Sequence, residues 1–168
     1  LLILQKAPGE KLSDLLVKDS DYAAIIGRCL KKAHLNITES EDHHPNTLLG
    51  DFVVSHLYVD SPNQLVTYID PGANFLVPGD QLEDVARFLF SVADEYRFRP
   101  FSAVSVMKKF LMGYSLEGIF CPRSTLAAVE ARKSRSIYKY FLQKTKFRAF
   151  IGSLIVRYNA CLIAWVVK

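Results

Sequence analysis

Residues 49–72 contain the pattern that decides the fold, and they read LGDFVVSHLYVDSPNQLVTYIDPG. Two apolar runs, 57–59 and 65–69, flank a Ser-Pro-Asn turn and predict a β-hairpin. Asp51 precedes the hairpin and Asp70 follows it. Because a two-stranded hairpin brings its ends together, we expect both carboxylates to lie in one cleft although they are distant in sequence.

An imidazole is expected at the same place, since His56 starts the first strand of the hairpin. One of the two carboxylates can orient and deprotonate a hydroxyl group. The other can hold Mg²⁺, a hard ion that prefers oxygen ligands and accompanies phosphates. A third interpretation assigns no chemistry to Asp51 and Asp70, because aspartate commonly stabilises turns. The spacing alone leaves these interpretations open.

The rest of the chain is predicted to be mostly helical. Leu1 to Leu4 is an apolar run that predicts a short buried strand. Helical spacing, capping residues and Pro122 predict helices over 13–17, 22–35, 82–96, 101–114, 122–143 and 146–167. A hairpin set among helices, with most of the helices after it, is an α+β fold.

The composition is that of a folded domain. Half of the 168 residues are hydrophobic and 23% are charged, which argues against disorder over most of the length. The net charge of +4 suits anionic ligands. Three scattered cysteines are too few for a disulfide framework and form no zinc-binding pair, so we expect a reducing, cytoplasmic location. The apolar start has no signal-peptide pattern, and we expect an earlier part of the protein upstream of Leu1.

Several further motifs occur in a fixed order along the chain. The first 16 residues read LLILQKAPGEKLSDLL, and Lys31-Lys32-Ala33-His34 ends a predicted helix. Leu49-Gly50-Asp51 and Ile69-Asp70-Pro71-Gly72 flank the hairpin. Residues 79–87 read GDQLEDVAR, and residues 110–114 read FLMGY. Over residues 1 to about 115 this order resembles the C-terminal lobe of the aminoglycoside phosphotransferase and choline kinase group, distant relatives of protein kinases.

The resemblance implies a small-molecule kinase that uses ATP and Mg²⁺ to phosphorylate a hydroxyl group. Asp51 would be the catalytic base, while Asp70 and His56 would hold the metal. Gln5, Lys6 and Ala7 would offer backbone groups to adenine. Asp84 would brace the catalytic loop by accepting hydrogen bonds from its backbone.

The resemblance also implies an organisation and a set of partners. Residues 1–12 would be a hinge strand and linker, residues 13–120 the kinase-like C-lobe core, and residues 121–168 basic and apolar helices of the same domain. The partners would be a nucleotide, a small-molecule acceptor such as a sugar or aminoglycoside, and an N-lobe supplied upstream. No nucleic-acid partner is expected, because the alternating aromatic and basic residues at 96–101 are interpreted as a helix end.

Two departures from the family pattern support an alternative function. Leu49 stands where the group has a His, and His56 stands where it has a metal-binding Asn. Imidazole suits Mg²⁺ less well than an amide oxygen does. The alternative is therefore a catalytically degenerate pseudokinase lobe that acts as a binding or interaction module.

The last third of the chain carries its own pattern. Residues 123–148 are strongly basic, which predicts either a solvated helix face or a patch for phosphate, an anionic substrate or lipid headgroups. Residues 150–167 are apolar on every side apart from Arg157 and Asn159. They predict a core helix, with a membrane-surface or partner-binding helix as the alternative. His43-His44 is interpreted as a solvated loop pair.

Overall fold

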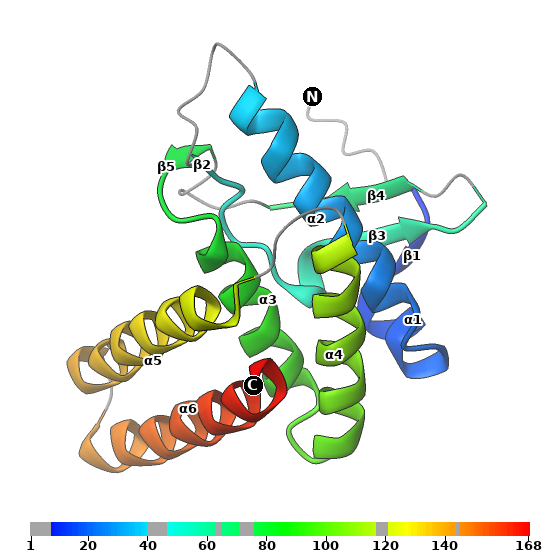
Figure 1. The fold of residues 1–168 in the computed structure, drawn as a ribbon. Coiled ribbons are helices and arrows are strands. Elements are labelled where there is room, and N and C mark those ends of the chain that lie inside the picture. The colour runs from blue at the N-terminus through cyan, green and yellow to red at the C-terminus, as the bar shows by residue number, and fades with distance from the viewer. Residues whose placement is uncertain (1–7, 40–46, 63–64, 71–75, 117–120, 144) are drawn as a thin grey trace, which may run out of the picture.

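The computed structural model describes residues 8–39, 47–62, 65–70, 76–116, 121–143 and 145–168 (Figure 1). The fold is mostly helical, 72%, with small antiparallel sheets, and the α+β class predicted from the sequence is confirmed. The helices are α1 (Leu12–Lys18), α2 (Tyr22–Glu39), α3 (Leu82–Glu95), α4 (Pro100–Leu116), α5 (Pro122–Gln143) and α6 (Lys146–Val167). A single 3-10 turn spans Val54–His56.

The strands form two small sheets. The first has the order β1-β3-β4 and consists of β1 (Glu10–Lys11), β3 (Leu57–Asp60) and β4 (Leu65–Tyr68). The second pairs β2 (Thr47–Leu48) with β5 (Val77–Pro78). Strands β3 and β4 form the predicted hairpin, in which Leu57 lies opposite Tyr68 and Asp60 lies opposite Leu65. The chain segments that carry Asp51 and Asp70 therefore join the hairpin at the same end, next to the Leu57–Tyr68 pair.

Most helix boundaries agree with the sequence prediction, and α2 shows the main difference. The prediction ended this helix at residue 35, whereas α2 continues to Glu39. The Thr38 hydroxyl donates a hydrogen bond to the His34 carbonyl (2.8 Å), and the Gln81 amide donates to the same carbonyl (3.2 Å). Contacts with the start of α3 therefore stabilise an extra turn that local sequence does not predict.

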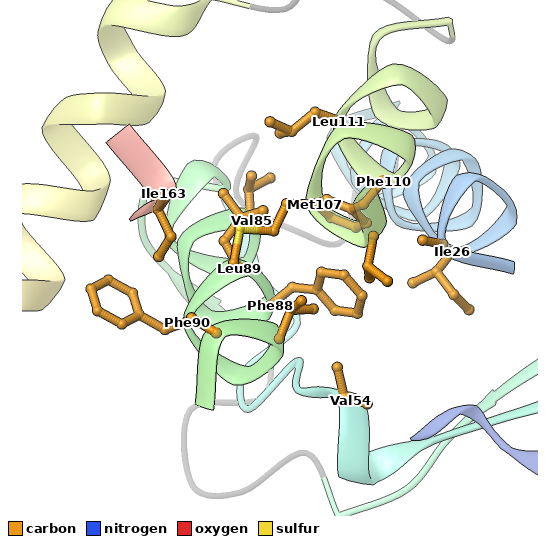
Figure 2. Packing of buried hydrophobic residues seen from close by; sticks show 14 of the residues in the cluster. Ile26, Val54, Val85, Phe88, Leu89, Phe90, Met107, Phe110, Leu111 and Ile163 are labelled. Atoms are coloured by element: carbon orange, nitrogen blue, oxygen red, sulfur yellow. The ribbon is translucent and has the colours of Figure 1, made fainter. Parts of the chain in front are cut away.

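Helix α3 lies at the centre of the hydrophobic core (Figure 2). All residues from Asp84 to Phe90 are buried, so this helix is enclosed on every side. The Phe88 ring stacks on Phe110 of α4 with 4.1 Å between ring centroids. Ile26 of α2 and Ile163 of α6 approach α3 from different directions. The core thus joins the hairpin region to the C-terminal helices in one body.

Helices α2 and α4 cross at unusually close range because each carries a glycine at the crossing. A Cβ added to Gly27 would lie 2.1 Å from the Phe110 carbonyl oxygen. A Cβ added to Gly113 would lie 2.1 Å from the Ala24 carbonyl oxygen. Each distance is too short for any side chain, so backbone packs directly on backbone. This crossing fixes the position of His34, in the second half of α2, relative to Tyr114 of α4.

Candidate active site

The loop at residues 49–52 is held by hydrogen bonds to both backbone groups of Leu49, its N–H and its carbonyl. The Leu49 N–H donates to Asp84 Oδ2 (2.7 Å). The Tyr68 hydroxyl, at the end of the hairpin, donates to the Leu49 carbonyl (3.1 Å). Gly50 follows with φ +99°, a conformation that glycine adopts readily and other residues rarely do. The backbone that carries Asp51 is therefore fixed from α3 and from β4.

A buried polar network of Asp84, His34 and Tyr114 supports this loop from the inside of the fold. Asp84 Oδ2 lies 3.2 Å from His34 Nε2, and His34 Nδ1 lies 3.2 Å from the Tyr114 hydroxyl. The side chains of His34 and Asp84 have no exposed surface. An ionised carboxylate only accepts hydrogen bonds, so with Asp84 ionised Nε2 carries the proton that it donates. The prediction that Asp84 braces the loop through its backbone is confirmed, and the role of His34 was not predicted.

Arg87 holds Asp51 from the other side. Its Nη1 donates to the Gly50 carbonyl (2.6 Å) and to Asp51 Oδ1 (3.2 Å), and its Nη2 donates to Glu83 Oε1 (2.7 Å). The Arg87 side chain is 6% exposed, whereas that of Asp51 is 52% exposed. A buried guanidinium thus presents a solvent-facing carboxylate. The sequence signal was the Glu83–Arg87 spacing of four residues on a helix, which by itself indicates only a surface pair.

Helix α5 adds positive charge to the same cluster. Arg135 Nη2 lies 3.1 Å from Glu83 Oε2 in an ion pair, so the Glu83 carboxylate bridges α3 and α5. Burial would raise the pKa of Glu83, but hydrogen bonds from Arg87 and Arg135 and their charges bring it below its ordinary value. Arg132 lies one turn before Arg135, and burial together with the charge of Arg87 lowers its pKa. Three guanidinium groups therefore gather near two carboxylates, those of Glu83 and Asp51.

His56 is tied to both ends of the site. Its Nδ1 lies 3.2 Å from the Asp51 carbonyl, which can only accept, so Nδ1 is the donor. In a neutral ring this leaves the Nε2 lone pair free to bind a metal ion or a proton. The His56 carbonyl accepts a hydrogen bond from the Ile69 N–H (2.9 Å), which extends the hairpin pairing by one step. His56 is therefore one link between the segment of Asp51 and the segment of Asp70.

Tyr68 connects the segments of Asp51 and Asp70: it lies two residues before Asp70, and its hydroxyl donates to the carbonyl of Leu49, two residues before Asp51. Burial raises the pKa of Tyr68 well above its ordinary value, and the negative charges of Asp84, Asp51 and Asp70 raise it further, against Arg87. Asp70 is exposed and has φ +50°, in the left-handed region that aspartate visits more often than most residues. Asp70 therefore follows β4 in a backbone conformation that directs the chain away from the strand. The pairing of Ile69 with His56 brings the two chain segments that carry these residues together.

The described residues contain no ready-made metal site. In the described ranges, no group of three or more His, Cys, Asp or Glu side chains is placed to hold a metal ion. The predicted ligands are a carboxylate oxygen of Asp70 and the Nε2 atom of His56, and Mg²⁺ prefers the oxygen to the nitrogen. Gln5, Lys6 and Ala7, the predicted nucleotide contacts, lie outside the described residues, as do Pro71, Gly72 and the His43-His44 pair.

The arrangement supports chemistry on a hydroxyl group at an exposed carboxylate. Asp51 is solvent-facing, its backbone is fixed, and positive charge lies beside it. An exposed, oriented carboxylate can accept a proton from a hydroxyl, and nearby guanidinium groups can stabilise a phosphorylated product. A scan against protein-family models found no matching family, and searches of curated proteins and of solved structures found no match.

Proposed function

We propose that this chain is the C-terminal lobe of an ATP- and Mg²⁺-dependent phosphotransferase that acts on a hydroxyl group of a small molecule, such as a sugar. The observation that carries the proposal is the double clamp on the loop of Asp51. The Leu49 N–H is bound by the buried Asp84, and Arg87 binds both the Gly50 carbonyl and the Asp51 carboxylate. Positioning of this kind is the main contribution of a protein to phosphoryl transfer.

Each residue has a role in this proposal. Asp51 orients the acceptor hydroxyl and takes its proton, a task that needs an exposed carboxylate on a fixed backbone. Asp70, with support from His56, binds the Mg²⁺ that accompanies the nucleotide phosphates. Arg87 keeps the Asp51 carboxylate aimed outward and balances its charge. The nucleotide is shared with an N-lobe upstream, and the protein works in the cytoplasm.

The alternative is a pseudokinase lobe that binds partners or nucleotide without turnover. Its specific support is the ion pair between Arg87 and Asp51, at 3.2 Å. Oδ1 of Asp51 already accepts a hydrogen bond from Arg87, so this oxygen is less available to a substrate hydroxyl. Leu49 also supplies no polar side chain at the position before Gly50. The two functions use the same residues and differ in whether phosphate is transferred.

The experiment uses the parent protein, including any segment upstream of Leu1, and measures its melting temperature with ATP, with Mg²⁺ and with both. A ligand at about 100 times its dissociation constant stabilises the native state by about 2.7 kcal/mol. We expect a shift that requires ATP and Mg²⁺ together and disappears in Asp70→Asn. The exposed Asp14 on α1 provides a matched control, and Asp14→Asn should keep the full shift.

Transfer of radioactive phosphate from ATP to a panel of sugars and amino sugars then separates the two functions. Asp51→Asn should keep the thermal shift and abolish transfer, because the fold and nucleotide binding do not need the base. A thermal shift without transfer to any acceptor, unchanged in Asp51→Asn, would favour the pseudokinase. Absence of any shift under all conditions would contradict the phosphotransferase and would favour the pseudokinase lobe as a module that binds partners without nucleotide.

A further inference from the structure

The last helix, α6, has two apolar faces, and only one of them is buried. The inner face packs against α3, α4 and α5. Its buried residues recur every three or four positions: Ala149, Gly152, Ser153, Val156, Asn159, Ala160, Ile163 and Val167. Asn159 is among them and donates a hydrogen bond to Asp94 Oδ1 of α3 (2.9 Å). The predicted core helix is therefore correct for this face.

The opposite face of α6 is apolar and exposed to solvent. Its members also recur at helical spacing, so they line one side of the helix, and we call them the outer stripe: Phe147, Phe150, Ile151, Leu154, Tyr158, Cys161 and Trp165. Phe147 is 74% exposed and Trp165 is 63% exposed. A soluble surface helix normally carries polar residues on this side. A continuous apolar stripe of this length marks a surface that contacts something else.

Positive charges lie along both edges of the outer stripe. Arg148 lies on one edge, and Lys146 and Arg157 lie on the other, as the helical spacing requires. Lys108 of α4 sits over the Trp165 ring, with 5.3 Å from Nζ to the ring centroid. Glu130 is the one acidic residue in the sequence from Pro122 to Lys168. The surface thus combines aromatic and aliphatic side chains with a rim of cations and almost no negative charge.

We propose that the outer stripe of α6 docks this protein onto the surface of an anionic lipid membrane. Aromatic residues partition into the interfacial layer of a bilayer, and Lys and Arg at the rim attract anionic headgroups. The charge of the rim selects a negatively charged partner, and the extended helix face fits a flat surface. This inference does not depend on the proposed phosphotransferase function.

The helix lies on the membrane and does not cross it. By length and apolar composition alone α6 could span a bilayer, but 39% of that apolar window is buried inside the fold. Spanning would remove the inner face from α3, α4 and α5 and would break the Asn159 to Asp94 hydrogen bond. Docking through the outer stripe leaves all these contacts in place. The same fold therefore serves in solution and at the surface.

The fluorescence of Trp165 tests the proposal directly, because it is the one tryptophan in the sequence. The 168-residue chain is titrated with vesicles of phosphatidylcholine and phosphatidylserine, and separately with pure phosphatidylcholine. We expect a shift of emission to shorter wavelength and co-sedimentation with the anionic vesicles, both reduced by salt. The double variant Phe150→Ser and Leu154→Ser should bind roughly tenfold more weakly or worse. The double variant Arg148→Gln and Arg157→Gln should lose a similar factor, roughly tenfold.

A matched control uses an exposed apolar residue away from the stripe. Val17→Ser, on α1 at the other side of the fold (Figure 1), should bind like the unchanged protein. No spectral shift and no sedimentation with anionic vesicles would overturn the proposal. Equal binding to pure phosphatidylcholine would overturn the role of the cations. A blue shift that grows with protein concentration in the absence of vesicles would assign the stripe to a second copy of the chain and would also overturn it.

Discussion

Replacing Asp84 by alanine should destabilise the whole fold and release the loop of Asp51. The Asp84 Oδ2 atom accepts hydrogen bonds from the Leu49 N–H (2.7 Å) and from His34 Nε2 (3.2 Å), and the side chain is fully buried. A hydrogen bond to a charged group contributes about 1.5–3 kcal/mol. Asp84→Ala loses two of them and leaves the donors buried. We therefore expect the free energy of unfolding to fall by about 4 kcal/mol.

The loss can be measured by urea and thermal denaturation followed by circular dichroism. For a domain of this size, 1 kcal/mol corresponds to about 2–4 °C in melting temperature, so the expected decrease is about 8–16 °C. Asp14→Ala on the exposed face of α1 is the control and should change stability by less than about 0.5 kcal/mol. A decrease below about 1 kcal/mol in Asp84→Ala would refute the assignment of this carboxylate as the support of the loop.

A double-mutant cycle distinguishes the interaction between Asp84 and His34 from a general loss of packing. His34→Ala removes the other side of the buried pair, and in combination with Asp84→Ala it should show a coupling free energy of about 0.5–3 kcal/mol. Additive effects of the two changes would mean that His34 and Asp84 do not stabilise each other. If Asp84→Ala is too unstable to purify at room temperature, Asp84→Asn can replace it in the cycle, and the coupling free energy can still be measured.

Three further changes test other parts of the structure. Gly113→Ala should lower the free energy of unfolding by about 1–3 kcal/mol in urea denaturation, because the new Cβ would meet the Ala24 carbonyl oxygen at 2.1 Å, whereas Ser134→Ala on the exposed side of α5 should not. The pKa of Glu83 is lower in the folded protein than its ordinary value of 4.5, so its contribution to stability is complete above pH 4.5 and is lost as the pH falls further. Glu83→Gln should therefore make the melting temperature decline less steeply as the pH is lowered. An unchanged slope would contradict the bridge from Glu83 to Arg87 and Arg135. The pKa of Tyr68 is raised from 10.0, so its contribution to stability is present below that pH and is lost as the pH rises beyond it. Tyr68→Phe should therefore reduce the alkaline loss of stability, and it should cost about 0.5–1.5 kcal/mol at neutral pH because the bond to Leu49 is missing. Unchanged stability at neutral pH would contradict this bond.

The elements with strong local signals could be predicted from the sequence. The hairpin was expected at 57–69 because its turn residues and apolar runs are local, and β3 and β4 lie there. Helices α5 and α6 begin and end at the predicted residues, since Pro122 and the polar stretch between them mark the boundaries. Local chemistry decides these elements, and their positions needed no knowledge of the rest of the fold.

The short strands and the supports of the site could not be predicted. Strands β1, β2 and β5 are two residues long and exist through pairing with distant segments, so no local pattern predicts them. Arg87 was expected on a helix, but its burial against the Gly50 carbonyl depends on how α3 packs under the loop. In α6 the apolar residues fill both faces, so periodicity could not tell the buried face from the outer stripe.

The two proposals meet at helix α5. This helix contributes Arg135 to the Glu83 carboxylate beside Asp51, and it packs along α6, whose outer stripe is the proposed membrane contact. Vesicle binding together with phosphate transfer that requires Asp51 would direct the search for the acceptor to hydroxyl compounds carried by a lipid, because α5 would connect the two surfaces. Vesicle binding without transfer would instead favour the pseudokinase alternative, in which the core serves to hold α5 and α6 in place. Transfer without vesicle binding would leave a soluble acceptor and a different partner for the stripe.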